Sequence, residues 1–132
     1  MSSVNYTPSS RNTSPLHPTC VANEICDFLD SIGEMFECQV TFSRIIPTAH
    51  HRMNTRLFYI NESITAYCLD VGHNIFESQT FYDIWWGCKK FDRSQFAVDG
   101  IHLGRAGIES LATSLIKYIS NAEFTTPFYH NY

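Results

Sequence analysis

The most strand-like part of the chain is Cys38–Pro47, which reads CQVTFSRIIP. Bulky and β-branched side chains favour an extended backbone, and Pro47 ends the run because proline has no N–H to give to a ladder. We therefore predict a strand over residues 40–46. The side chains that carry this prediction are Val40, Phe42, Ile45 and Ile46.

Helical periodicity surrounds this strand. Apolar residues recur at three- and four-residue steps over 21–35, 50–69 and 105–120, which is the spacing of one helix face. A second, short strand is predicted near Ile75. The segment 82–96 fits neither period, and we predict a long loop with a helical turn there. Alternation of helices and strands predicts an α/β fold with parallel strands. Because two strands leave open edges, we expect the sheet to be incomplete.

Composition divides the chain into an ordered middle and two looser ends. Residues 1–18 are rich in Ser, Thr, Asn and Pro and predict a flexible N-terminal arm. Residues 19–120 are expected to form one domain, since the chain has 132 residues and 44% hydrophobic side chains. Residues 121–132 are expected to form a frayed tail.

Charge and cysteine usage argue against several classes of function. A net charge of −4 without a long basic run disfavours nucleic acid as a partner. Neither a signal peptide nor a membrane span is recognisable, so we predict a soluble, cytoplasmic protein. The cysteines are odd in number and lack a C-x-x-C pair, which predicts mostly buried thiols, without a metal or cofactor. They are Cys20, Cys26, Cys38, Cys68 and Cys88.

The part of the sequence that could carry chemistry is Asp99–Leu111, DGIHLGRAGIESL. Asp99 and His102 stand three residues apart, at the entrance to a predicted helix. An imidazole can take the proton of a serine hydroxyl, and a carboxylate can fix its tautomer. An isolated D-x-x-H also arises by chance, with Asp99 as a turn cap and His102 as an ordinary loop histidine. The residues alone leave both interpretations open.

The longer run VDGIHLGRAGIESLATSLIKYI resembles the C-terminal block of the SGNH hydrolases, the GDSL-type esterases and lipases. That block has Asp-x-x-His-Leu, a short Gly-containing turn and an amphipathic helix. CQVTFSRIIP and MNTRLFYINESITAYCLDVGHNIF resemble the family's preceding strand, helix and strand, so the resemblance covers about residues 20–120. It implies a flavodoxin-like three-layer α/β/α fold with a parallel sheet, here of two to three strands. It also implies His102 as general base, Asp99 as its orienting carboxylate and esters as substrates.

Other blocks of that family have no counterpart here. The sequence contains no Gly-Asp-Ser, which holds the family's nucleophile, and no Gly-x-Asn-Asp. Ser43 is the substitute nucleophile that we considered, but a polar residue closing a strand explains it better. We therefore expect a partial, truncated SGNH-type esterase domain that is inactive by itself. The alternatives are a non-catalytic binding module on an SGNH-like scaffold and a mobile-element-derived fragment.

Two further clusters have mainly structural interpretations. His50 and His51 begin a predicted helix, and adjacent helical side chains point apart, so they are poor joint metal ligands. The aromatic segment Phe81–Trp86 could pack in the core or line an acyl pocket, and packing is favoured. Self-association is also predicted, through Trp85, Trp86 and the exposed edge of the strand over 40–46.

Overall fold

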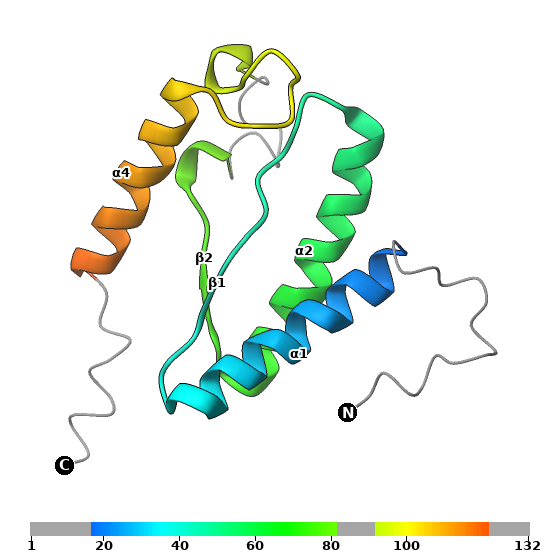
Figure 1. The fold of residues 1–132 in the computed structure, drawn as a ribbon, viewed down its shortest axis with the longest axis vertical. Coiled ribbons are helices and arrows are strands. Elements are labelled where there is room, and N and C mark those ends of the chain that lie inside the picture. Colours follow the sequence, from blue (N-terminus) through cyan, green and yellow to red (C-terminus); the bar gives the residue numbers. More distant parts are fainter. Residues whose placement is uncertain (1–16, 82–91, 122–132) are drawn as a thin grey trace. The chain divides into compact units, whose positions relative to one another are not determined.

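The computed structural model describes residues 17–81 and 92–121 (Figure 1). The elements are α1 (Pro18–Phe36), β1 (Thr41–Ser43), α2 (His51–Val71), β2 (Asn74–Phe76), the 3₁₀ turn η3 (Arg93–Gln95) and α4 (Arg105–Asn121). The three predicted helices and the predicted helical turn are therefore present. The predicted arm and tail lie almost entirely outside the described residues and stay predictions, and Trp85, Trp86 and Cys88 also lie outside them.

β1 and β2 lie side by side and parallel. The N–H of Asn74 donates to the carbonyl of Val40 at 2.9 Å, and the N–H of Arg44 donates to that of Phe76 at 2.9 Å. The α/β class with an incomplete parallel sheet is therefore confirmed. The strand predicted over 40–46 is shorter than expected, because β2 offers only three residues to pair with. Ile45 and Ile46 lie beyond this ladder.

The chain divides into two compact units, and the first comprises residues up to Phe42 together with Tyr59–Ile75. Its core is formed by buried side chains of α1, of β1 with the residue before it, and of α2, which are Cys20, Ala22, Leu29, Val40, Phe42, Ile60, Ile64 and Cys68. Burial raises the pKa of the Cys26 thiol to about 11 and also raises that of Cys68. Among the described cysteines, Cys20 and Cys68 are buried, Cys26 is partly exposed, and Cys38, which follows the end of α1, is exposed.

A polar cluster also lies in the first unit. Asp30 on α1 accepts a short hydrogen bond from the hydroxyl of Tyr67 on α2, and its Oδ1 lies 2.9 Å from Nε2 of His73. These bonds lower the pKa of Asp30, the Tyr67 bond first, and Asp30 in turn raises the pKa of Tyr67 to about 12. The cluster joins α1, α2 and the residue that precedes β2.

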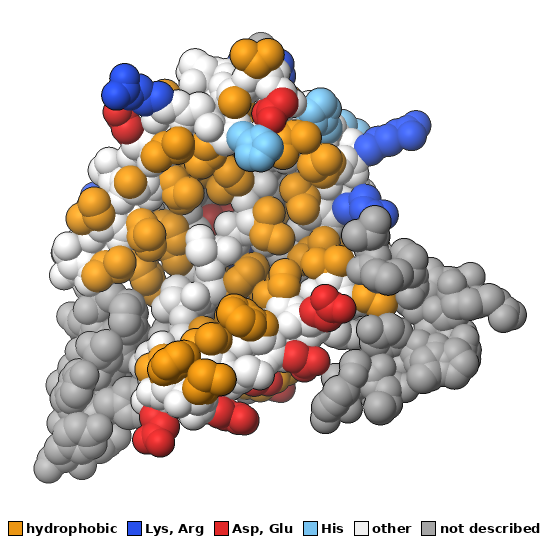
Figure 2. Space-filling model, in the orientation of Figure 1, with side chains coloured by type: hydrophobic (Ala, Val, Ile, Leu, Met, Phe, Trp, Pro, Cys, Tyr) orange, Lys and Arg blue, Asp and Glu red, His pale blue; other side chains and the backbone are white. Residues whose placement is uncertain are grey.

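The second unit contains residues 43–58 and the chain from Phe76 onward. In it the predicted apolar face of α4 is largely uncovered, and only Gly107 of this helix is buried. The exposed members of that face are Ile108, Leu115, Ile116 and Ile119. Figure 2 shows hydrophobic side chains over this helix. The apolar periodicity over 105–120 therefore locates the helix, but most of the apolar face that it predicts is exposed instead of packed against the sheet.

α4 contacts its unit at a few well-defined points. A Cβ added to Gly107 would lie 2.0 Å from the carbonyl oxygen of Gln95, so glycine is needed where the helix meets η3. The rings of Phe76 and Tyr118 pack at 5.0 Å between centroids. Among the described residues, no helix is long and apolar enough to cross a membrane.

Candidate active-site loop

The loop that carries Asp99 and His102 is closed by backbone hydrogen bonds at its base. The N–H of Ala97 donates to the carbonyl of His102 at 2.8 Å, and the N–H of Gly104 donates to that of Gln95 at 3.0 Å. Phe96 and Leu103 form an isolated antiparallel bridge. Because both ends of the loop are tied together, its turn residues occupy a restricted space.

Asp99 and His102 are joined within this loop. Oδ2 of Asp99 lies 2.5 Å from Nδ1 of His102. Oδ1 of the same carboxylate accepts from the backbone N–H groups of Ile101 at 2.8 Å and His102 at 3.0 Å. Gly100, which follows Asp99, has a φ of 72°, a left-handed conformation that favours glycine. The turn therefore aims the carboxylate at the imidazole.

The electrostatics of the pair favour an ionised Asp99. The hydrogen bond from the His102 side chain is the largest effect that lowers the pKa of Asp99, followed by the two backbone N–H groups. An ionised carboxylate only accepts, so Nδ1 of His102 must carry the proton of this bond. In the neutral imidazole Nε2 is then the free acceptor, which is the arrangement that a general base requires.

The pair is open to solvent, and no nucleophile faces it within the part of the chain that the structure describes. The side chains of His102 and Asp99 are 80% and 45% exposed. No described side chain forms a hydrogen bond with Nε2 of His102. Ser43 is the last residue of β1, is exposed, and makes no hydrogen bond to His102. The structure thus joins His102 to Asp99 and leaves Ser43 unconnected to them.

The loop lies beside the segments that leave the carboxyl ends of both strands (Figure 1). After β1, the N–H of Ala49 donates to the carbonyl of Gly100 at 2.8 Å. After β2, Phe81 packs edge-on against Phe96, with 6.1 Å between ring centroids. Carboxyl ends of parallel strands are the usual place for ligand sites in α/β folds. Phe81 is 1% exposed, which favours core packing for this member of the aromatic segment.

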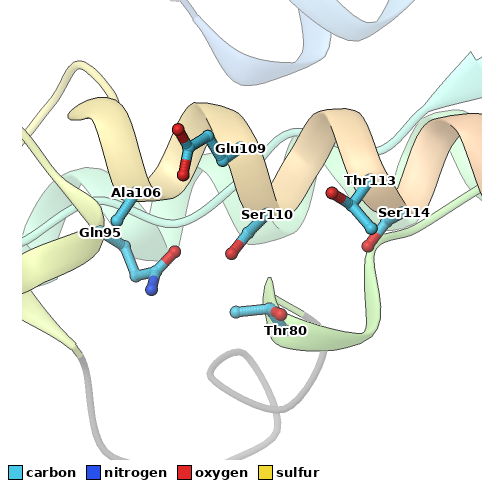
Figure 3. Close-up of a pocket in the computed structure, with 7 residues that line it drawn as sticks. All are labelled: Thr80, Gln95, Ala106, Glu109, Ser110, Thr113 and Ser114. Carbon is cyan, nitrogen blue, oxygen red and sulfur yellow. The ribbon is translucent and has the colours of Figure 1, made fainter.

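A polar hollow of about 470 Å³ lies along α4 (Figure 3). Figure 3 shows Ser110, Thr80 and Gln95 extending toward one another from α4, from the segment after β2, and from η3. Neither Asp99 nor His102 lines this hollow. Its hydroxyl and amide groups can hydrogen-bond, and the carboxylate of Glu109 also lines it.

Sequence reasoning missed two arrangements that the structure contains. Nε2 of His50 lies 3.0 Å from the carbonyl oxygen of Asp99, and the Tyr67–Asp30–His73 cluster was not foreseen. Both join residues that are far apart in the sequence, so no local motif signals them. Within the described ranges, no group of three or more His, Cys, Asp or Glu side chains is placed to hold a metal ion.

The sequence matches no protein-family model and no curated protein. The structure is similar to the esterase domain of the ZfL2-1 ORF1 protein from the zebrafish ZfL2-1 retrotransposon. The TM-score is 0.65 at 18% sequence identity, and the match covers 79% of this chain and 63% of that one. The chain thus has an SGNH-like fold and spans less than two thirds of that esterase domain.

Proposed function

We propose that Asp99 and His102 are the orienting carboxylate and the general base of an ester-hydrolase site. The observation that carries this proposal is the 2.5 Å contact between Oδ2 of Asp99 and Nδ1 of His102, which leaves Nε2 exposed. In ester hydrolysis such an Nε2 takes the proton of a serine hydroxyl as the hydroxyl attacks the ester carbonyl. It then returns the proton to the leaving alcohol.

The nucleophile and the oxyanion donors are proposed to come from outside these 132 residues. The sequence contains no Gly-Asp-Ser, and Ser43 makes no hydrogen bond to His102. General-base assistance alone contributes roughly 10²–10⁴-fold, well below the 10⁶-fold or more of typical enzymes. These residues by themselves are therefore expected to be inactive, and an ester is a substrate only of the completed site.

Hydrolysis of p-nitrophenyl acetate by the isolated chain tests the inactive state. We expect wild type, His102→Ala and Ser43→Ala to give the same slow rate. Rapid hydrolysis that disappears in Ser43→Ala and His102→Ala would contradict the proposal, because it would identify Ser43 as the nucleophile.

A loop graft tests whether the pair can serve as the base. Residues 95–104 would replace the structurally aligned segment of the zebrafish esterase domain. The graft begins at Gln95 and ends at Gly104 because a backbone hydrogen bond joins these two residues at the base of the loop. We expect the graft to hydrolyse esters, and His102→Ala within it to lower kcat by at least about 10²-fold. Equal rates for the folded graft and its His102→Ala variant would contradict the proposal.

A second candidate function, association between copies of this chain, is favoured by the uncovered face of α4. Ile108, Ile116 and Ile119 are all more than half exposed on one helix. Contiguous exposed apolar surface typically marks an interaction site. Trp85 and Trp86, where self-association was also predicted, lie outside the described residues.

A further inference from the structure

The ring of His50 reaches the backbone of Asp99 across 49 residues of sequence. Nε2 of His50 lies 3.0 Å from the carbonyl oxygen of Asp99. Since a carbonyl oxygen only accepts, His50 donates from Nε2–H. We propose that His50 is a positioning residue, which holds the Asp99 backbone and thereby the carboxylate that orients His102. This inference rests on the proposed function of the Asp99–His102 pair.

His50 is itself held by a small hydrogen-bonded turn before α2. Its N–H donates to Oγ1 of Thr48 at 3.0 Å, and this hydroxyl lies 2.9 Å from Oδ1 of Asn54. The amide of Asn54 also donates to the carbonyl of Thr48 at 2.8 Å. Thr48 is 5% exposed. The backbone that carries the His50 ring is therefore fixed from within, while the ring itself lies at the surface.

A second hydrogen bond joins the same two segments. The N–H of Ala49 donates to the carbonyl of Gly100 at 2.8 Å, next to the bond from His50 to Asp99. A Cβ added to Gly100 would lie 2.7 Å from Cβ of Ala49. Ala49 and His50 thus form hydrogen bonds with the consecutive carbonyl groups of Gly100 and Asp99. The approach is close enough to exclude a side chain at position 100.

Two different sets of hydrogen bonds hold the side chain and the backbone of Asp99. The carboxylate is held by the N–H groups of its own loop, and the peptide carbonyl is held by His50. Without the hydrogen bond from His50, the peptide group between Asp99 and Gly100 is freer to rotate. The carboxylate of Asp99 then loses its alignment with Nδ1 of His102. Because the His50 ring is exposed, its removal should affect this alignment more than the overall fold.

The test is the rate at which the Nδ1 proton of His102 exchanges with solvent, measured by NMR at low temperature and constant pH. We expect His50→Ala to speed this exchange at least tenfold. His50→Gln, whose side-chain amide can still donate to the Asp99 carbonyl, should restore much of the protection. His51→Ala is the matched control, since His51 is the adjacent exposed histidine and its ring makes no hydrogen bond among the described residues.

Unchanged exchange in His50→Ala, or equal acceleration in His51→Ala, would overturn the positioning role. Should His50→Ala unfold the chain, the ¹⁵N shifts of wild-type His50 decide instead. A protonated Nε2 supports the role and a bare Nε2 overturns it. Failure of the proposed function is a different result, because then wild-type His102 itself lacks a proton on Nδ1.

Discussion

Oδ2 of Asp99 lies 2.5 Å from Nδ1 of His102, in a turn whose own N–H groups hold the other carboxylate oxygen. The relative placement of these two side chains is thus decided by the geometry of the turn over Asp99–His102. That turn depends on the left-handed conformation of Gly100, so a substitution at this position should disturb the Asp99–His102 contact.

Gly100→Ala is expected to destabilise the chain more than Gly72→Ala does. Both glycines have positive φ values, 72° and 90°, so alanine in either place costs about 1–2 kcal/mol of conformational strain. Only at Gly100 does the new Cβ meet a neighbour, Ala49 Cβ at 2.7 Å, whereas Gly72 has open space. Overpacking should add about 1–3 kcal/mol. Denaturant unfolding measures both values, and equal costs would contradict the close approach of Ala49.

Tyr67→Phe is expected to change how stability depends on alkaline pH. The hydrogen bond to Asp30 raises the folded-state pKa of Tyr67 to about 12, above the ordinary tyrosine value of 10.0. The hydroxyl's contribution is therefore fully present below pH 10 and is lost as the pH rises through 12. The difference in thermal midpoint between wild type and Tyr67→Phe should be constant up to about pH 10 and shrink above it.

Tyr59→Phe provides the control for this pH effect. The hydroxyl of the exposed Tyr59 has a weak contact of 3.4 Å with Oγ1 of Thr19 and makes no short bond to a carboxylate. Its removal should leave the pH profile of wild type unchanged. A Tyr67→Phe difference that stays constant from pH 9 to 12 would argue against the Tyr67–Asp30 bond.

Charged substitutions on α4 test association between copies. Ile116 and Ile119 are 64% and 59% exposed, so Ile116→Lys and Ile119→Lys should leave thermal stability within about 0.5 kcal/mol of wild type, as is usual at surface positions. Sedimentation should show concentration-dependent association of wild type and a shift toward monomer in the double variant. Wild type that stays monomeric at high concentration would remove this candidate function.

Local patterns predicted the parts of the structure that depend on nearby residues. The helix ranges follow from periodicity within each segment, and the Asp99–His102 bond spans three residues of one loop. The length of β1 depends on its partner, so the predicted strand over 40–46 was too long. The exposure of Ile116 depends on whether another part of the protein covers α4, which the periodicity of the helix itself cannot indicate. The hydrogen bond from His50 to Asp99 links segments that are 49 residues apart, so no local pattern in the sequence indicates it.

The imidazole tautomers, read from ¹⁵N shifts at a pH where the rings are neutral, show directly whether Asp99 fixes the proton of His102 on Nδ1. We expect His102 to carry its proton on Nδ1 and to have a bare Nε2, whereas His50 and His73 should carry their protons on Nε2. Asp99→Asn should remove the preference for Nδ1–H at His102 and leave His73 unchanged. A proton on Nε2 of wild-type His102 would contradict the claim that Asp99 holds this histidine ready to act as a base.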